Sequence, residues 1–534
     1  MPNNRRLNVF LPLLFAIVLA LGMYLGHKMP AARNSDSAIF FRQNNRGTVQ
    51  EVLDLLKFNY VDTLDVNDIQ QEAIEGMLSH LDPHSIYIPP AQVQSVNEDL
   101  QGNFEGIGVE FNITNDTVNV AGVIPDGPSS AAGVLTGDKI IKVDDSLIAG
   151  KKITSENIRK LLRGPNGSKV KTTMLRDGQT KDIVIKRGLI PLLSVDASYI
   201  VAPSTGYIKL NKFSETSYDE FLAAVRKLTK QGMTKLILDL RQNNGGLLDA
   251  ATRIADEVLE DRQIIVYTQG KAYPRQDYKT QKPGSFEKGG LAVLTDEGSA
   301  SASEILAGAI QDYDRGVIIG RRTFGKGLVQ EPFELNNGGT LRLTIARYYL
   351  PSGRSIQKSY KEGRAAYDED LTERYNHGEF LNGDSIRQAD TMKYQTAKGR
   401  IVYGGGGITP DIFIPFDTSR YSSGLTELYT RTVLSDFVYN YYIKHRTQFD
   451  GYKSPEDFNK QFSVSPDLYR EFLAYAEKEN VKVKTLTSRD EPEVKTRLKA
   501  MFARQLWRTE GFYQVSNGND PVIKKAIEEL QKSK

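Results

Sequence analysis

The sequence of 534 residues contains no cysteine, one tryptophan and little net charge. The absence of cysteine excludes disulfides, thiolate zinc sites, iron–sulfur clusters and a cysteine nucleophile. It does not identify the compartment, because oxidising compartments permit disulfides without requiring them. The 69 basic and 66 acidic residues leave a formal charge of +3, so no overall field favours nucleic acid as a partner. With 40% hydrophobic residues the chain is not disordered, and its length predicts two to four domains.

Long apolar runs are also scarce, and the exception lies at the amino terminus. Residues Val9–Leu25 carry no charge and, at about 17 residues, reach the lower limit for a membrane-spanning helix. Arg5 and Arg6 precede the run and favour a cytoplasmic amino terminus with an exported body. Two interpretations stay open: an uncleaved anchor, which the length of the run favours, or a signal peptide cleaved near Ala31 and Ala32. We therefore expect a cell-envelope protein, either anchored once in the inner membrane with its body in the periplasm, or secreted there.

Local patterns then divide the chain. Helical spacing of apolar residues continues to about Pro90, where Pro89-Pro90 ends it, and short alternating strands follow. Within those strands lie a short helix, Ser155–Leu162, with Ser155 as its cap, and an Asp177-Gly178 hairpin signal. Continuous apolar strands next alternate with helices, which predicts βα crossovers and a sheet covered on both faces. The rest of the chain, after residue 418, is mostly helical and charged.

These changes of pattern give the predicted boundaries. They are residues 1–34 for the signal-anchor segment, 35–92 for a helical region, 93–188 for a β-rich domain with one helix, 189–416 for an α/β domain and 417–534 for a helical extension.

A glycine-rich loop begins the β-rich domain. Gly106, Ile107, Gly108 and Val109 resemble the carboxylate-binding loop of a PDZ domain, and the segment Gly137-Asp138-Lys139-Ile140-Ile141 lies at the distance expected for that domain. Glycines without a Cβ let consecutive N–H groups point at one anion, here the carboxyl terminus of a peptide that extends the sheet. The alternative is that these glycines only make a tight turn.

Three alternate serines, Ser299, Ser301 and Ser303, lie in a small-residue turn between a buried strand and a helix. A serine at a helix amino terminus faces unpaired N–H groups that stabilise developing negative charge, although helix capping is its common role. No histidine lies in this strand–helix region, so lysine is the other candidate base. Lys326, flanked by glycines after a buried strand, qualifies when burial lowers its pKa; a solvated loop lysine is the alternative.

At this point a resemblance becomes informative. Residues 298–330 resemble the active-site segment of the carboxy-terminal processing peptidases, which are serine endopeptidases with a Ser–Lys dyad. The resemblance covers most of residues 78–415. Its motifs are Leu81-Asp82-Pro83-His84-Ser85, the PDZ domain, Asp239-Leu240-Arg241 with Asn243 and Gly245-Gly246, Gln311-Asp312-Tyr313, Thr323-Phe324-Gly325-Lys326-Gly327, Pro351–Gln357 and Ile408–Asp411. It implies an α/β fold with a crotonase-like or ClpP-like protease core, an inserted β-rich PDZ domain, and helical additions at both ends.

The resemblance also implies the roles of single residues. It selects Ser301 as the nucleophile, Lys326 as the base that takes its proton and returns it to the leaving amine, and Gln330 as the residue that orients the lysine. The implied partners are protein substrates with free carboxyl-terminal tails, held by the PDZ loop and cleaved near that terminus. The implied chemistry needs no metal and no cofactor.

The oxyanion would be held by two backbone N–H groups. One belongs to Ala302, and the other to Gly245 or Gly246, between which the sequence does not choose.

Two departures from the family pattern have no assigned role. Residues 358–406 form an insertion rich in Tyr, Arg and Asp, and a helical extension follows residue 418. Each could be a lid, a tether or an assembly surface. The helical amino-terminal region could pair with a second copy, so a homo-oligomer stays open.

Other hypotheses fit the sequence less well. A non-catalytic scaffold predicts the loss of the serine, lysine or glutamine, and all three are present. A penicillin-binding type of hydrolase has the S-x-x-K pattern of Ser285-Phe286-Glu287-Lys288, but its other elements are missing. His80, Asp82 and His84 suggest a metal site, yet turn chemistry explains the aspartate and no third strong ligand is near.

Overall fold

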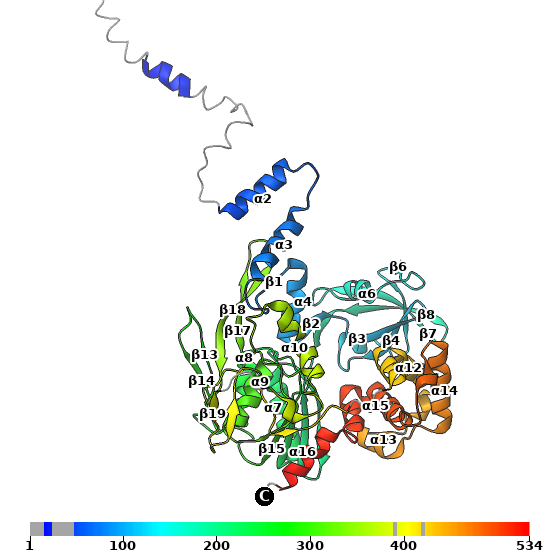
Figure 1. Ribbon diagram of the computed structural model, residues 1–534. Coiled ribbons are helices and arrows are strands. Elements are labelled where there is room, and N and C mark those ends of the chain that lie inside the picture. Colours follow the sequence, from blue (N-terminus) through cyan, green and yellow to red (C-terminus); the bar gives the residue numbers. More distant parts are fainter. Residues whose placement is uncertain (1–14, 24–46, 388–391, 418–421, 533–534) are drawn as a thin grey trace, which may run out of the picture. The chain divides into compact units, whose positions relative to one another are not determined.

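The computed structural model describes residues 15–23, 47–387, 392–417 and 422–532 (Figure 1). They belong to two compact units, residues 1–74 and 75–534. In the first unit, residues 15–23 are helical, and helix α2 (Thr48–Asn59) buries none of its residues. Both ends of the apolar run Val9–Leu25 lie outside the described residues, and none of the helices within the described residues has the length and apolar character to cross a bilayer.

The second unit is built on a six-stranded sheet. Its strand order is β10-β11-β12-β15-β16-β21, and all neighbours are parallel except β10, an antiparallel edge. The strands are β10 (Val195–Ala202), β11 (Thr205–Leu210), β12 (Lys235–Asp239), β15 (Gly290–Thr295), β16 (Val317–Gly320) and β21 (Ile412–Phe413). The inner strands are continuous apolar runs because both of their faces are buried.

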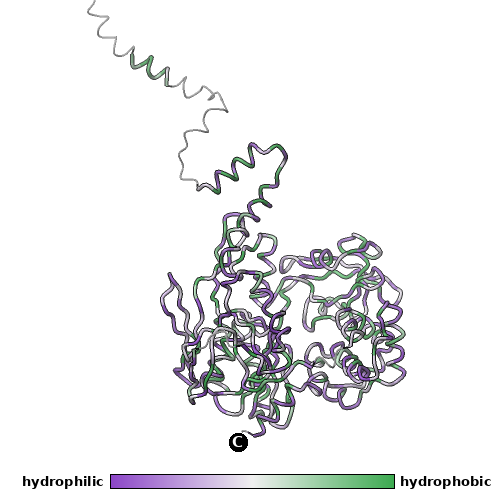
Figure 2. The backbone as a smooth tube through the Cα atoms, in the orientation of Figure 1, coloured by the Kyte–Doolittle hydropathy of each residue, from purple (hydrophilic) through white to green (hydrophobic). Residues whose placement is uncertain are grey.

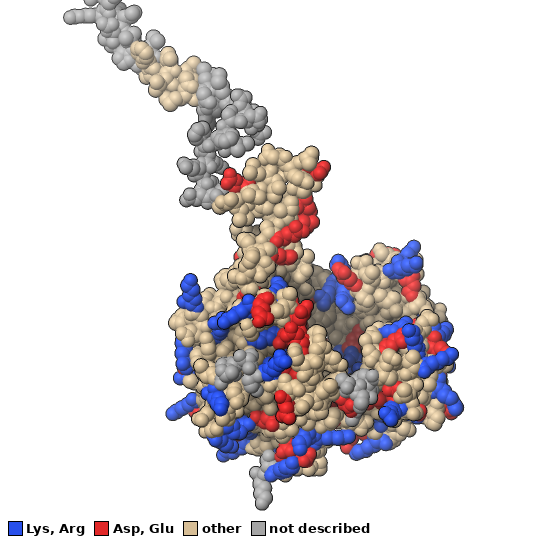
Figure 3. Space-filling view, viewed as in Figure 1, with Lys and Arg blue, Asp and Glu red and all other residues tan. Residues whose placement is uncertain are grey.

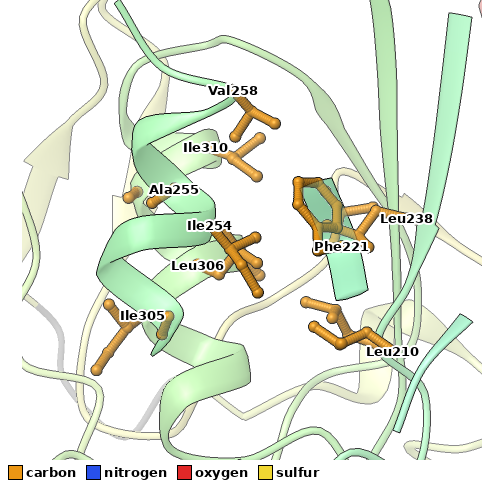
Figure 4. Close-up of a cluster of buried hydrophobic side chains, with 14 of the residues drawn as sticks. Leu210, Phe221, Leu238, Ile254, Ala255, Val258, Ile305, Leu306 and Ile310 are labelled. Atoms are coloured by element: carbon orange, nitrogen blue, oxygen red, sulfur yellow. The ribbon is translucent and has the colours of Figure 1, made fainter. Parts of the chain in front are cut away.

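Helices cover both faces of this sheet, as the sequence predicts. Side chains alternate along each strand, so Leu236 and Leu238 face one core while Ile237 faces another. The first core packs against α7 (Ser217–Lys230), α8 (Leu248–Asp256) and α9 (Ala302–Asp312), and Figure 4 shows Phe221, Ile254 and Leu306 meeting there. The second core packs against α16 (Pro521–Lys532), which is the end of the carboxyl-terminal extension. Figure 2 shows green, hydrophobic stretches along the strands and these helices.

A second sheet lies beside the first and carries one long strand. Its order is β1-β18-β13-β14, with β17 paired to β18. The strands are β1 (Ile86–Ile88), β13 (Ile264–Gln269), β14 (Gln276–Lys279), β17 (Leu328–Glu334) and β18 (Thr340–Tyr349). Helix α3 (Val66–Leu78) precedes β1, and α4 (Pro90–Gln101) follows it. The sequence predicts that Pro89-Pro90 ends the helical region, but Pro90 begins α4, because the fixed φ of proline suits the first turn of a helix.

The β-rich domain is a separate sheet with the order β3-β4-β5-β7-β8 and β6 beside β5. Its elements are β3 (Val109–Thr114), β4 (Thr117–Val123), α5 (Pro128–Ala131), β5 (Lys139–Val143), β6 (Ser146–Leu147), α6 (Ser155–Leu162), β7 (Lys169–Arg176) and β8 (Gln179–Lys186). Strands β2 (Asn103–Gly106) and β9 (Gly188–Pro191) pair where the chain enters and leaves it. The hairpin at Asp177-Gly178 is confirmed. Thr154, rather than Ser155, caps α6, since its hydroxyl accepts the N–H of Asn157.

The two departures from the family pattern both have ordered structure. The insertion contains α10 (Arg364–Asn376), η1 (Gly383–Ser385), β19 (Lys393–Gln395) and β20 (Ile401–Tyr403). The extension contains α11 (Ser423–Thr430), α12 (Val433–Lys444), η3 (Arg446–Gln448), α13 (Pro455–Gln461), α14 (Pro466–Lys478), η4 (Val483–Thr485) and α15 (Glu491–Ser516), which share a core of their own.

Basic and acidic side chains are interspersed over the visible surface (Figure 3).

Helix α15 also joins the β-rich domain to the sheet. It kinks at Trp507 and Arg508, whose backbone angles are not helical. Beside the kink, Gln505 donates a hydrogen bond to the carbonyl of Ala121 at 2.8 Å, and Arg508 pairs with Glu110 at 2.6 Å. The extension therefore holds the β-rich domain and covers the six-stranded sheet at the same time.

Candidate active site

Ser301 lies immediately before α9, as the sequence predicts. Its φ of 54° and ψ of −113° are strained for a residue with a side chain. Its backbone N–H donates to Oε2 of Glu304 at 2.8 Å, and the side chain is 6% exposed. A buried carboxylate thus holds the serine in a conformation that its own backbone disfavours.

Lys326 lies in the loop between β16 and β17, and the same carboxylate holds it. Its N–H donates to Oε2 of Glu304 at 2.8 Å, while the N–H of Gly325 donates to Oε1 at 2.7 Å and the hydroxyl of Thr323 donates to Oε1 as well. Glu304 itself is fully buried. The backbones of the candidate nucleophile and the candidate base therefore meet on one side chain.

The surroundings of Lys326 favour its neutral form. Burial and the positive charge of Arg342 lower the pKa of Lys326 to about 8, although the carboxylates of Glu304 and Asp82 oppose the shift. At this pKa a useful fraction of the amine is unprotonated near neutral pH. A solvated loop lysine, the alternative interpretation of the sequence, does not describe this environment.

Ser301, Lys326 and Gln330 line one cavity of about 1020 Å³. In the described part of the chain no hydrogen bond joins their side chains, and Nε2 of Gln330 is buried without any partner. Catalytic hydrogen bonds are often long in a free enzyme and shorten when substrate binds. The structure thus brings the three residues together in one cavity, without a side-chain hydrogen bond among them in the described residues.

The two glycines that the sequence leaves open differ in the structure. The N–H of Gly245 donates to Oδ1 of Asn243 at 2.9 Å, whereas the N–H groups of Gly246 and Ala302 have no acceptor among the described residues. A Cβ on Gly245 would lie 2.7 Å from the carbonyl oxygen of Ala300 and 2.9 Å from the nitrogen of Ala302, so no side chain fits there. Gly246 and Ala302 are the available donors.

The predicted carboxylate-binding loop has two free donors. Gly106 pairs with β9 and Val109 with β4, but the N–H groups of Ile107 and Gly108 find no acceptor in the described ranges. Gly108 has a φ of 73°, which a residue with a Cβ rarely adopts. Strand β3 is the edge of its sheet, so its outer side can take an added strand.

Sequence reasoning did not find three residues of this site. Glu304 could have been found, because Ser301 and Glu304 have the spacing of a capping box. Arg342 and Tyr348 lie on the inward face of β18 and line the cavity with Ser301. Their only signal is the period of two along a strand whose pairing the sequence does not reveal.

The Leu-Asp-Pro-His-Ser motif makes a turn beside the cavity. Asp82 accepts the N–H groups of His84 at 3.0 Å and Ser85 at 3.1 Å, which is the turn chemistry expected, and the hydroxyl of Thr344 at 2.8 Å. Burial and the charge of Lys326 lower the pKa of His84 to about 4. Among the described residues no group of three or more His, Asp or Glu side chains could hold a metal ion.

The insertion contacts the loop that carries Lys326. Arg374 on α10 donates to the carbonyls of Arg322 at 2.8 Å and Thr323 at 3.1 Å. The hydroxyl of Tyr367, also on α10, lies 2.8 Å from Nε2 of His84. The insertion is therefore a support for the loop that carries Lys326.

Two known protein families and several known proteins match parts of this sequence. Residues 204–363 match the model of peptidase family S41, and residues 106–186 match that of the PDZ domain. The "Carboxy-terminal-processing protease" of Bartonella bacilliformis is 35% identical over 356 residues, which are 65% of this chain and 81% of that protein. The chain belongs to peptidase family S41.

Other relatives and one further family also match. The "Probable CtpA-like serine protease" of Staphylococcus haemolyticus is 35% identical over 304 residues, 56% of this chain and 60% of that protein. The solved "photosystem II D1 C-terminal processing protease" covers 70% of this chain and 88% of its own, with 26% identity and a TM-score of 0.36. Residues 425–508 match a family of unknown function (DUF8443).

This S41 peptidase is a carboxy-terminal processing serine protease, and it acts on proteins with carboxyl-terminal tails. The predicted activity and the predicted α/β fold with a PDZ domain and a helical extension are confirmed. The S41 match spans the serine turn, the lysine loop and Gly245-Gly246.

Proposed function

We propose that Ser301 and Lys326 are the catalytic dyad of this peptidase. Oγ of Ser301 attacks the scissile carbonyl and gives its proton to the neutral amine of Lys326. The C–N bond then breaks, Lys326 returns the proton to the leaving amine, and an ester joins the substrate to Ser301. Water, deprotonated by Lys326, hydrolyses this ester and restores the serine. The single observation that carries the proposal is Glu304, whose carboxylate holds the backbones of both residues beside one cavity.

The remaining roles follow from the donors around the cavity. The N–H groups of Ala302 and Gly246, which have no acceptor within the described part of the chain, bind the oxyanion of the tetrahedral intermediate. Gln330 orients the amine of Lys326 through its side-chain oxygen. Tyr348 closes the cavity next to Ser301.

The PDZ domain takes the substrate's carboxyl terminus before cleavage. The terminal carboxylate binds the N–H groups of Ile107 and Gly108, and the peptide adds to the open edge of β3. Capture either delivers the tail to Ser301 or releases an inhibited state of the enzyme. A peptide amidated at its carboxyl terminus should be a poorer substrate, and equal cleavage of the amidated and free peptides would refute the PDZ role.

The dyad is tested with single substitutions and a covalent probe. Ser301→Ala and Lys326→Ala should each abolish peptide hydrolysis while circular dichroism and thermal unfolding show an intact fold. Ser285→Ala and Lys288→Ala, the pair with the S-x-x-K pattern, are matched controls that should keep wild-type rates. A fluorophosphonate should label Ser301 and no other serine. Wild-type hydrolysis by Lys326→Ala would exclude the dyad.

We propose that the enzyme belongs to the cell envelope, on the basis of its amino-terminal segment. The charge-free run Val9–Leu25, preceded by Arg5 and Arg6, supports a single inner-membrane anchor with the peptidase body in the periplasm. Membrane fractionation and amino-terminal sequencing of the mature protein test this. A mature chain that starts near Ala31 would mean a secreted periplasmic enzyme instead.

A second copy of the chain is the partner we propose for the amino-terminal helices. Helix α2 buries none of its residues, and its apolar side chains Val52, Leu55 and Phe58 are exposed by 48%, 55% and 74%. Apolar exposure of this kind is typical of an interaction surface. Val52→Glu with Leu55→Glu should convert an oligomer to a monomer in analytical ultracentrifugation, and a wild-type monomer would rule the pairing out.

A further inference from the structure

Two side-chain donors in the catalytic cavity have no assigned partner. Arg342 is half-buried on β18, and within the described residues its guanidinium makes neither an ion pair nor a hydrogen bond. Nε2 of Gln330, on β17, is buried without a partner as well. An unpaired buried donor such as Nε2 of Gln330 is rare in native proteins, because it loses its hydrogen bonds to water without replacement, whereas Arg342 lines the cavity and is only half-buried.

The pairing of the two strands brings these donors together. Gln330 is opposite Thr344 and Pro332 is opposite Arg342, so Gln330 and Arg342 are diagonal neighbours on one face of the β17–β18 pair. Diagonal neighbours are about 7–8 Å apart at the backbone, which is within reach of side chains as long as these. That face lines the cavity that contains Ser301 and Lys326.

The other cations of the cavity wall are neutralised. Lys212 pairs with Asp99 at 2.8 Å, and Arg508 pairs with Glu110 at 2.6 Å. No ion pair joins Arg342 to Asp196, the remaining carboxylate of the wall, in the part of the chain that the structure describes. Apart from Lys326, Arg342 is thus the cation of this wall that has no counter-ion.

We infer that Arg342 and the amide of Gln330 bind a carboxylate of the substrate peptide inside the catalytic cavity. A guanidinium presents two parallel N–H groups that match a carboxylate, and the added amide N–H gives a third donor. Arg342 is then a specificity-determining residue that selects substrates with a negative charge near the scissile bond. This inference rests on the proposed function of the cavity.

The carboxylate has two sources in a peptide. One is an Asp or Glu side chain within a few residues of the scissile bond, and the other is the terminal carboxylate of a short tail. The PDZ loop also recognises a terminal carboxylate, so the experiment must separate the cavity from that loop.

Steady-state cleavage of three peptides tests the inference. They share one sequence and carry, respectively, Glu near the scissile bond with an amidated end, Gln there with an amidated end, and Gln there with a free end. The Glu is placed at each position on either side of the bond. For at least one carboxylate-bearing peptide, wild-type kcat/KM should exceed that of the neutral peptide by about tenfold or more, as expected for a charge-assisted contact. This ratio should fall close to one in Arg342→Gln.

Comparison of ratios removes the other effects of the substitution. Loss of the positive charge also changes the pKa of Lys326, but this alters the rates of all three peptides alike. Arg347→Gln is the matched control, because Arg347 lies on the outward face of β18 and donates to Tyr360; it should keep the wild-type ratio. Arg342→Lys, which keeps the positive charge but lacks the two parallel N–H groups of the guanidinium, should retain part of the preference for the carboxylate-bearing peptide.

The outcomes separate the two proposals. If the wild-type enzyme prefers the Glu peptide and Arg342→Gln abolishes that preference, Arg342 binds a side-chain carboxylate. If the enzyme prefers the free-end peptide and Arg342→Gln abolishes that preference, Arg342 binds the terminal carboxylate. A free-end preference that survives in Arg342→Gln belongs to the PDZ loop. If no carboxylate preference depends on Arg342 while Ser301→Ala is inactive, the inference is wrong and the dyad stands. If Ser301→Ala and Lys326→Ala still cleave the peptides, the proposed function itself fails.

Discussion

Glu304 accepts the backbone N–H of Lys326 at 2.8 Å on the same carboxylate oxygen that accepts the N–H of Ser301 at 2.8 Å. Its other oxygen accepts Gly325 and the hydroxyl of Thr323. The residue is fully buried, and every contact on it is a donor. The distance between the proposed nucleophile and the proposed base therefore depends on one buried side chain.

Glu304→Gln should damage both stability and activity. Either carboxylate oxygen that becomes an NH₂ group would face an N–H donor, so at least one buried donor loses its acceptor. We expect the free energy of unfolding to fall by about 2 kcal/mol or more, and kcat to fall at least about tenfold because the dyad loses its alignment. Urea unfolding and peptide hydrolysis measure the two effects.

The control for this substitution lies in the same turn. Glu297 pairs with Arg321 at 2.8 Å, and neither Ser301 nor Lys326 donates to it among the described residues, so Glu297→Gln should leave kcat unchanged. Equal losses in Glu304→Gln and Glu297→Gln would contradict the role given to Glu304.

The ionisation of Lys326 should set the acid limb of the pH profile. A protonated amine cannot take the proton of Ser301, so kcat/KM should rise with pH through about 8, the pKa of Lys326. Rates measured from pH 6 to pH 10 with one neutral peptide test this. An acid limb near pH 4, the pKa of His84, would point to the histidine instead.

Two substitutions should move this limb in opposite directions. Arg342 lowers the pKa of Lys326, so Arg342→Gln should shift the limb to higher pH. Glu304 raises that pKa, so the residual activity of Glu304→Gln should have its limb at lower pH. A limb that neither substitution moves would not belong to Lys326.

Much of the fold is visible in local patterns of the sequence. The continuous apolar strands predict a buried sheet with helices on both faces, and Asp177-Gly178 predicts its hairpin, because both signals depend on near neighbours. The pairing of β1 (Ile86–Ile88) with β18 (Thr340–Tyr349) leaves no such signal, since it joins segments far apart in the chain. The same holds for α16, whose apolar face covers the sheet although its sequence looks like any amphipathic helix.

The candidate site likewise has features that local sequence patterns predict and features that they do not. The position of Ser301 at a helix amino terminus follows from a strand, a small-residue turn and a helix, but its choice over its neighbouring serines came from the family resemblance. The free N–H of Gly246 depends on the side chain of Asn243, which takes the N–H of Gly245. The position of Arg342 beside Gln330 follows from the register of β17 and β18, which the sequence does not reveal. Contacts between distant segments decide these points.

The insertion should act on catalysis through the lysine loop. Arg374→Met removes the donors to two buried carbonyls, while Glu379 keeps its partner Arg322 at 2.6 Å. We expect a loss of about 2 kcal/mol or more in the free energy of unfolding and a lower kcat. KM should stay nearly constant, because no residue of α10 lines the catalytic cavity among those described.

Two variants of α10 make this prediction specific. Tyr367→Phe keeps the ring beside Phe324, at 5.9 Å, but loses the hydrogen bond to His84, and should cost about 1 kcal/mol. Glu369→Ala changes an exposed residue of the same helix and should have no effect on kcat. An increase of KM without a change of kcat in Arg374→Met would mean that the insertion binds substrate instead.

Lys326→Met should stabilise the protein that it inactivates. Below pH 8 the folded protein holds a proton on a buried amine whose pKa is about 8, whereas an ordinary lysine has a pKa of 10.5. The unfolded chain therefore binds this proton more tightly, and wild-type stability should rise as the pH goes from 8 to 10.5. Methionine removes the charge, so we expect the free energy of unfolding at pH 7 to increase by up to about 3 kcal/mol.

The gain should depend on pH in a way that an ordinary packing effect does not. At pH 10 the wild-type amine is neutral in the folded state, so the advantage of Lys326→Met measured by urea unfolding should shrink. Lys209, a buried lysine that donates to the carbonyl of Arg241 and lies 3.6 Å from Asp239, is the contrasting case. Lys209→Met should destabilise the protein at both pH values, since it leaves those acceptors without their donor. If Lys326→Met is no more stable than wild type at pH 7, the charged amine does not reduce the free energy of unfolding. The pKa of Lys326 would then not be lowered, and the proposed base would lose its support.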